Sequence, residues 1–164
     1  MIEKLVEDIK SEFGEEYIKV VNVGLQETLQ VDKSILVALC QWLRDHPSYY
    51  FDFLANITAI DYYPDTRFAV AYNLTSIPYQ KQLTLRVELE QVDRSKDNLP
   101  EVPSVTSVWR TADWHEREAY DLMGIYFTQH PDLRRILLPD DWEGFPLRKD
   151  YEDPESYHGI SIKN

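Results

Sequence analysis

The chain has 164 residues, which is within the usual size of one folded domain. Its composition, with 43% hydrophobic and 28% charged residues, is that of a globular protein and excludes an intrinsically disordered one. The formal net charge of −12 repels phosphate backbones and anionic lipid headgroups, so we expect neither nucleic acid nor a membrane surface as a direct partner.

The N-terminal residues alternate charged and apolar side chains, and they lack the basic start and apolar core of a signal peptide. No stretch approaches the ~20 apolar residues needed to cross a bilayer. One cysteine, Cys40, excludes an internal disulfide framework and fits a reducing compartment. We therefore expect a cytoplasmic chain that does not insert into the membrane.

Apolar residues at helical spacing predict a first amphipathic helix that ends at Gly14. Residues 19–23 and 28–31 are typical of two short strands around a turn at Gly24. Asp32 is then expected to cap a second helix by accepting hydrogen bonds from free backbone N–H groups. We expect that helix to end before Pro47. Its predicted buried side consists of Ile35, Leu36, Leu39, Trp42 and Leu43.

Three strands are predicted next. Residues 50–60 are strongly apolar and indicate a central strand, whereas residues 68–74 and 83–89 alternate apolar with polar or small side chains. Such alternation places one face on a core and the other in water, as in an antiparallel sheet.

A polar loop at 93–103 separates these strands from a short helix predicted at 105–110. Asp113 and Glu116 have the spacing of a reciprocal capping arrangement, which would begin a helix that ends at Gly124. Beyond Phe127, prolines and glycines interrupt the chain and regular periodicity is lost. The prediction is an α+β fold with helices on one face of a mostly antiparallel sheet. It divides the chain into an α+β domain at 1–127 and an extended irregular segment at 128–164 that packs on the domain and on partners.

The usual residues of a cofactor site are missing from the sequence. Its five glycines are not clustered, so no glycine-rich nucleotide loop can be assigned. One cysteine cannot hold an iron–sulfur cluster, and Cys40 is expected to be a small buried apolar side chain and not a reactive thiol. None of the four histidines forms a helical zinc pair with another. We expect the chain to bind no metal and no redox cofactor.

The most unusual segment is 114–124, which carries Glu116, Glu118 and Asp121. One interpretation makes these carboxylates acid–base groups with shifted pKa values. The interpretation that we favour makes them partners in an ion-pair network that holds the irregular segment on the helix, because a buried carboxylate needs a cation or hydrogen-bond donors. The available cations are Arg110, Arg117, Arg134, Arg135, Arg148 and Lys149.

A longer pattern contains this segment. It consists of Glu116-Arg117-Glu118, Asp121-Leu122-Met123, His130, Arg134 and Ile136-Leu137, with Pro103-Ser104-Val105 before it and Pro146-Leu147-Arg148-Lys149-Asp150-Tyr151 after it. The pattern resembles the signature of the 30-kilodalton subunit family of respiratory complex I, the NADH-quinone oxidoreductase. The resemblance covers nearly the whole chain and is most specific at 103–151.

The resemblance implies a structural subunit in the peripheral arm of a proton-translocating NADH:quinone oxidoreductase, on the cytoplasmic side of the cell membrane. Electrons would pass from NADH to quinone through FMN and iron–sulfur clusters that other subunits hold. The expected partners are the subunit that forms the quinone site and the neighbouring iron–sulfur subunits. The family positions expected at the segment-anchoring or interface region are Glu116, Arg117, Glu118, Asp121, His130, Arg134, Arg135, Arg148, Lys149, Asp150 and Tyr151.

Two alternatives remain. The first is the equivalent subunit of a ferredoxin-linked quinone reductase or a membrane-bound hydrogenase, since other subunits select the electron donor. The second is a stand-alone enzyme that uses Glu116, Glu118 or Asp121, which would require a water-excluding pocket around these carboxylates.

Overall fold

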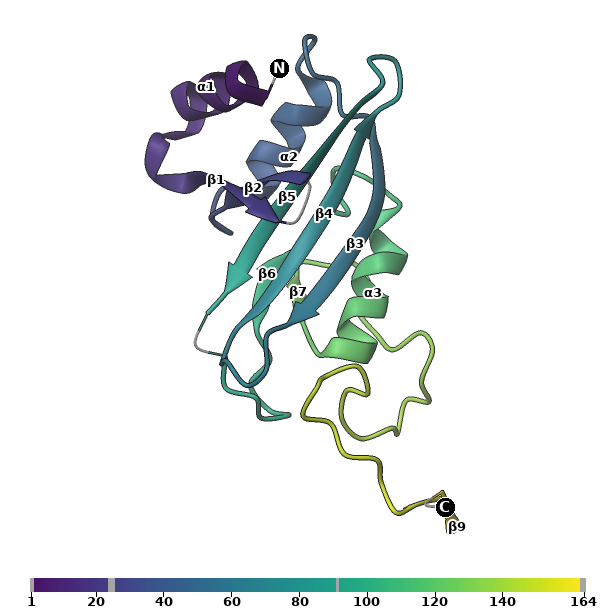
Figure 1. Cartoon of the computed structure of the whole chain (residues 1–164). Helices are drawn as coiled ribbons and strands as arrows, with labels where there is room; N and C mark the ends of the chain where they lie inside the picture. Colours follow the sequence, from purple (N-terminus) through teal and green to yellow (C-terminus); the bar gives the residue numbers. More distant parts are fainter. Residues whose placement is uncertain (1, 24–25, 91, 163–164) are drawn as a thin grey trace.

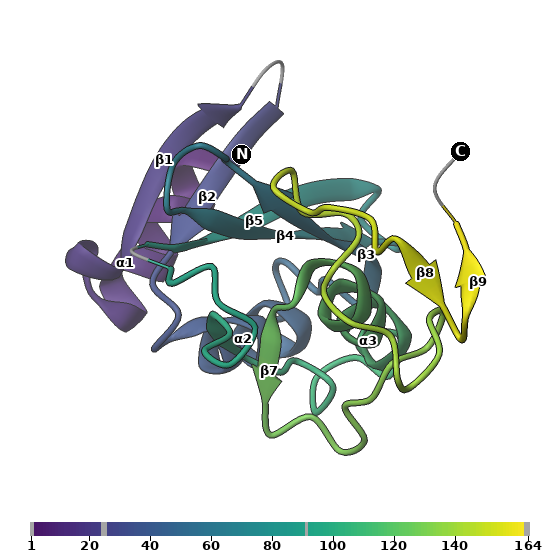
Figure 2. The same cartoon turned by 90° about the horizontal axis from the view of Figure 1, so that it is seen from below.

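The computed structural model describes residues 2–23, 26–90 and 92–162, and it shows a mixed five-stranded sheet with helices on one face (Figures 1 and 2). This confirms the predicted α+β class. The elements are α1 (Ile2–Phe13), η1 (Glu15–Tyr17), β1 (Ile18–Val23), β2 (Gln26–Val31), α2 (Leu36–Asp45), β3 (Phe53–Asp61), β4 (Phe68–Ser76), β5 (Lys81–Leu89), β6 (Glu101–Pro103), α3 (Ala112–Met123), β7 (Tyr126–Thr128), β8 (Ser156–Tyr157) and β9 (Ile160–Ser161).

The sheet has the strand order β1-β2-β5-β4-β3. Neighbouring strands in the sheet are antiparallel except β2 and β5, which run parallel over Thr28–Gln30 and Thr84–Arg86. The predicted alternation is clearest in β4, where Phe68, Val70 and Tyr72 are fully buried. In Figure 2, α2 and α3 lie on the same side of the sheet, and they cover this buried face.

The two N-terminal helices form largely as predicted. Helix α1 buries Leu5, Val6 and Ile9 in the common core and ends before Gly14, whose φ of 107° suits a residue without a Cβ. Helix α2 ends before Pro47, and it buries Cys40 completely. The predicted turn at Gly24 lies outside the described residues.

The predicted cap of α2 is wrong. Asp32 Oδ1 accepts hydrogen bonds from the backbone N and the hydroxyl of Ser34, at 2.8 and 2.6 Å. The carboxylate therefore closes the turn that precedes the helix, and Ile35, at the N-cap position, provides no side-chain cap. An aspartate followed by a serine two residues later is also typical of such a turn. In this structure Asp32 stabilises the turn and does not cap the helix.

The predicted central position of the strand at 50–60 is also wrong. Among the described strands, β3 lies at the edge of the sheet and pairs only with β4. Tyr50 and Phe51 precede the strand, and Phe53 within it is 41% exposed. A continuous apolar run does not distinguish a central strand from an edge strand that a helix covers. Here α3 packs along β3 and buries Leu54 and Ile57.

The short strands β6 and β7 were not predicted. Strand β6, within the polar loop, pairs in parallel with β7, so the chain before α3 lies next to the chain after it. The predicted helix at 105–110 is a single hydrogen-bonded turn, in which Val105 O accepts from the backbone N of Val108 and of Trp109. The strands β6 and β7 and the single turn after β6 are all too short to produce a periodic pattern in the sequence.

The C-terminal segment follows the lower end of α3 in Figure 1 and is irregular up to the short hairpin of β8 and β9. The hairpin turns at His158 and Gly159, which both have positive φ angles of 49° and 77°. This geometry matches the two-residue turns that connect twisted antiparallel strands. The segment has little secondary structure, so other contacts hold it on the domain.

Helix α3 ends at Gly124, whose φ of 67° is left-handed and whose backbone N donates to Tyr120 O. A Cβ at this position would lie 2.5 Å from Arg148 Nη2 and 2.6 Å from the Phe145 ring. We predict that Gly124→Ala lowers the free energy of unfolding by about 2–4 kcal/mol, since it combines left-handed strain with overpacking. Urea unfolding monitored by circular dichroism measures this.

Gly159→Ala is the matched control, because Gly159 also has positive φ but nothing lies within 4 Å of an added Cβ. We expect a loss of about 1 kcal/mol there. Equal losses for the two variants would show that crowding by Phe145 and Arg148 does not contribute.

Candidate interface around helix α3 and the C-terminal segment

Helix α3 buries three ionisable side chains, Glu116, Arg117 and Asp121. Its inner face is formed by Ala112, Glu116 and Ala119, and Arg117 and Asp121, four residues apart, lie on a second face. Helical spacing places Glu118 on the apolar stripe with Leu122, but Glu118 is exposed. The buried carboxylates are therefore those of Glu116 and Asp121.

The side chain of Asp121 has no exposed surface and holds the start of the irregular segment. Its Oδ1 accepts from Arg135 Nη1 at 2.8 Å, and its Oδ2 accepts from three successive backbone N–H groups. These belong to Ile136, Leu137 and Leu138, at 3.0, 2.7 and 3.0 Å. Burial by itself would raise the pKa of Asp121, but Arg135 and the three N–H groups outweigh it and hold the pKa below its usual value.

Arg135 and Arg117 extend this network through backbone carbonyl oxygens. Arg135 Nη2 donates to Trp142 O and Gly144 O at 3.0 and 2.9 Å, and thereby folds the segment over itself. Arg117 donates to the carbonyls of Arg134 and Arg135 at 3.2 and 3.1 Å. Each guanidinium uses several of its donors, which a lysine ammonium could not do in the same planar geometry.

Arg148 lies over the C-terminal end of α3. Its Nε donates to Met123 O at 2.8 Å and its Nη2 to Gly124 O at 3.1 Å, while its guanidinium stacks 4.6 Å from the Phe145 ring centroid. A cation at this end of a helix satisfies free carbonyls and interacts favourably with the helix dipole. The segment is thus fixed to both α3 and the loop that follows it.

A second ion-pair cluster, which was not predicted from the sequence, joins the sheet to the segment. Asp61, at the end of β3, pairs with Arg94, which also contacts Asp150 at 3.2 Å. Asp61 also accepts from the backbone N of Lys149 at 2.9 Å. Burial acts to raise the pKa of Asp61, and the hydrogen bonds from Arg94, Lys149 and Tyr63 lower it overall. An aspartate at the end of an apolar strand was the only indication in the sequence.

Glu116 performs a different task from the predicted reciprocal cap. Its carboxylate is fully buried and accepts from Ser104 Oγ at 2.6 Å and from the backbone N of Val105 at 2.7 Å. It therefore joins α3 to the turn before it, whereas Asp113 lies inside the helix. His130 Nε2 lies 3.9 Å from Glu116 Oε2 and 3.2 Å from the Asp113 carboxylate.

Burial raises the pKa of Glu116 to about 7, and the hydrogen bonds from Ser104 and Val105 act in the opposite direction. Burial also raises the pKa of the Cys40 thiol, with a further contribution from the charge of Glu116. A thiol in this state is not nucleophilic, in agreement with the predicted buried apolar role of Cys40.

The remaining family positions lie at the margin of this network. Arg134 is mostly exposed and pairs with Asp132 at 2.9 Å. Lys149 contributes its backbone N to Asp61, and Tyr151 lies beside Gly144. Glu118 borders a shallow groove of about 160 Å³ between α3 and β3.

Around the network, large apolar side chains project away from the core. Trp114 on α3 is 61% exposed, and Leu137 and Leu147 on the segment are 65% and 60% exposed. Ile160 and Ile162 near its end are also exposed. Polar contacts thus fix the backbone while apolar side chains face outward, an arrangement suited to binding another protein.

Metal-binding clusters and membrane spans are both absent from the described residues. These residues contain no group of three or more His, Cys, Asp or Glu side chains placed to hold a metal ion. None of the described helices is long and apolar enough to span a bilayer.

Residues 29–157 match the family described as "Respiratory-chain NADH dehydrogenase, 30 Kd subunit". The chain belongs to this family. It is 42% identical over 156 residues to a subunit of NADH-quinone oxidoreductase from Chloroherpeton thalassium, with 94% of this chain and 62% of that protein covered. The corresponding NADH-quinone oxidoreductase subunit of Geotalea uraniireducens is also 42% identical over 156 residues, with 92% and 90% covered.

The corresponding protein of Chlorobium phaeobacteroides is 47% identical over 136 residues, which cover 83% of this chain and 78% of that protein. Among solved structures, a chain of the archaeal membrane-bound sulfane sulfur reductase superposes with a TM-score of 0.72 at 20% identity. The superposition covers 92% of this chain and 85% of that chain, and it shows a shared fold.

The buried Glu116 predicts a pH dependence of stability. Its pKa is about 7 in the folded chain and 4.5 for the unperturbed group, so the folded state binds the proton more tightly. The stabilisation from protonated Glu116 is fully present below pH 4.5 and is lost as the pH rises through 7. The free energy of unfolding falls by about 3 kcal/mol in total over this range. We predict that Glu116→Gln removes this loss, as urea unfolding between about pH 5 and 8 would measure.

Glu118→Gln is the control on the same helix. Glu118 is exposed, so this variant should keep the pH dependence of the unmodified chain. If Glu116→Gln shows the same decrease in stability with rising pH as the unmodified chain, Glu116 is not the group that titrates.

Proposed function

We propose that the chain is a structural subunit of the peripheral arm of a proton-translocating NADH:quinone oxidoreductase. In this role it binds no cofactor itself and supports electron transfer from NADH to quinone by holding other subunits in fixed positions. FMN, iron–sulfur clusters and quinone are bound by those subunits. The match of residues 29–157 to the family carries this proposal.

The geometry around α3 supports a role in assembly. The network of Asp121, Arg117 and Arg135 fixes an irregular backbone without a large apolar core of its own. The exposed side chains of Leu137 and Leu147 are then presented in a defined arrangement. Preorganisation of this kind lowers the entropy lost on association. The proposed partners are the subunit that forms the quinone site and the neighbouring iron–sulfur subunits, at the cytoplasmic side of the cell membrane.

The alternative is the equivalent subunit of a related complex with another electron donor, such as a ferredoxin-linked quinone reductase or a membrane-bound hydrogenase. The shared fold with a chain of the archaeal sulfane sulfur reductase makes this the second candidate. The names of the relatives, which are 42–47% identical, favour NADH as the donor.

A stand-alone enzyme is less well supported. Glu116 and Asp121 have no exposed side-chain surface, so no substrate reaches them without a rearrangement of the fold. Glu118 is accessible, but it borders only a shallow groove. A general acid or base must come within hydrogen-bond reach of the proton that it transfers.

Co-purification tests the proposal. The chain is tagged at its N-terminus, native membranes are solubilised gently, and the accompanying subunits are identified. We expect a large assembly with quinone-site and iron–sulfur subunits, whose donor subunits identify the electron donor. Leu147→Gln should recover roughly fivefold less assembly, with normal turnover in the complexes that do assemble.

The control is Ile77→Gln, since Ile77 is 60% exposed like Leu147 but lies in the turn between β4 and β5, at the opposite end of the sheet in Figure 1. It should leave recovery unchanged. Recovery of the chain alone, or assembled Leu147→Gln complexes with complete subunit content but blocked turnover, would contradict the structural role.

A further inference from the structure

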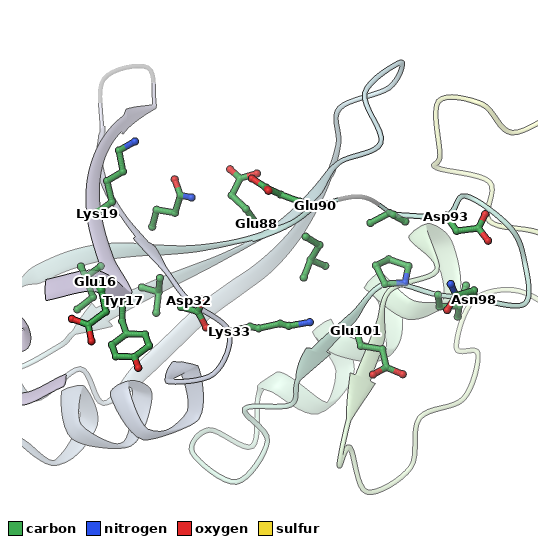
Figure 3. Close-up of a pocket in the computed structure, with 17 residues that line it drawn as sticks. Glu16, Tyr17, Lys19, Asp32, Lys33, Glu88, Glu90, Asp93, Asn98 and Glu101 are labelled. Atoms are coloured by element: carbon green, nitrogen blue, oxygen red, sulfur yellow. The ribbon is translucent and has the colours of Figure 1, made fainter. Parts of the chain in front are cut away.

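A cleft of about 600 Å³ lies away from the C-terminal segment, between the β1–β2 hairpin, the end of β5 and β6 (Figure 3). Three parts of the chain that are distant in sequence form its walls. These are residues 16–19 with 30–33, residues 88–90 with 92–93, and residues 98–101. The cleft takes no part in the network around α3.

The cleft is acidic, with six carboxylates against the ammonium groups of Lys19 and Lys33. The carboxylates belong to Glu16, Asp32, Glu88, Glu90, Asp93 and Glu101. Glu16, Glu90 and Glu101 are exposed, and none of their carboxylates forms an ion pair or hydrogen bond with the described residues. They come from three separate walls, so a bound cationic chain could contact all of them.

Glu88, at the wall of the cleft, is paired with two arginines. Its side chain is only 10% exposed. Its Oε1 contacts Arg86 Nη2 at 2.7 Å, whereas the buried Oε2 accepts no hydrogen bond from the described residues and lies 3.6 Å from Arg67. The charge of Glu88 is therefore balanced by two arginines, and the carboxylates left for a cationic partner are the exposed ones.

The backbone of β5 offers a second recognition element. Strand β2 pairs with β5 only as far as Arg86, and after Val31 the chain turns away, with the backbone N of Asp32 donating to Tyr17 O. Glu88 and Leu89 line the cleft beyond this point, and on the side away from β4 no strand of the described chain pairs with them. Such an edge can pair with an added extended strand.

We propose that this cleft binds an extended segment of another protein that is rich in lysine or arginine. The segment would lie along the free edge of β5, with its backbone paired to the strand and its cationic side chains at Glu16, Glu90 and Glu101. This surface is distinct from the one around α3.

The test uses the full isolated chain and a nine-residue peptide in which lysine alternates with threonine, with binding followed by titration calorimetry and amide NMR. We expect binding with shifts at the Glu88 and Leu89 amides. The triple variant Glu16→Gln, Glu90→Gln, Glu101→Gln should bind roughly tenfold more weakly. The control Glu3→Gln, Glu7→Gln, Glu118→Gln removes the same charge from exposed positions outside the cleft and should change affinity by less than about twofold.

A second peptide with the same charge but N-methylated at alternate backbone amides tests the strand pairing, and we expect it to lose binding. Equal weakening in both triple variants would reduce the interaction to general charge attraction and overturn the proposal. So would the absence of shifts at Glu88 and Leu89. The assay needs no other subunit, so its failure is distinct from failure of the co-purification.

Discussion

The structure depends on the full burial of one carboxylate, that of Asp121. A buried charge of this kind persists only if all of its acceptor capacity is used, and removal of a buried partner typically destabilises a protein by about 3–5 kcal/mol. Here the donors are Arg135 and three successive backbone N–H groups of a segment that forms no regular structure of its own. The requirement to satisfy Asp121 thus fixes the path of the chain after β7.

The other polar contacts extend the same principle. Arg148 binds the carbonyls at the end of α3, and Asp61 binds Arg94 and the backbone N of Lys149, so the segment is held by α3, the loop before β6 and the sheet. Because polar contacts provide this attachment, apolar side chains such as Leu147 can remain exposed. These exposed apolar side chains are available to a partner.

The sequence predicts those features that depend on local patterns. Helical spacing located α1, alternation located β4 and β5, and Gly124 marked the end of α3. The prediction that 128–164 packs on partner subunits remains a prediction. Features set by long-range pairing were not predictable, and these include the edge position of β3 and the parallel pairing of β6 with β7.

The candidate site was predicted in its residue types more than in its geometry. The family pattern included Arg117, Asp121 and Arg135, and the structure brings these together. Helical spacing alone did not reveal that Glu116 is buried and Glu118 is exposed, because it does not determine which side of the helix faces the core. Ser104 was noted only as part of the family pattern, since its contact with Glu116 joins residues from a turn and a helix.

Hydrogen exchange at the backbone amides of Ile136, Leu137 and Leu138 tests most directly whether Asp121 fixes this segment. The account predicts that these amides are protected in the unmodified chain. Asp121→Asn should lower their protection by roughly tenfold or more, while β4 stays protected. The control Asp132→Asn, at an exposed aspartate of the same segment, should leave them unchanged. Unchanged protection in Asp121→Asn would contradict the central role of this carboxylate.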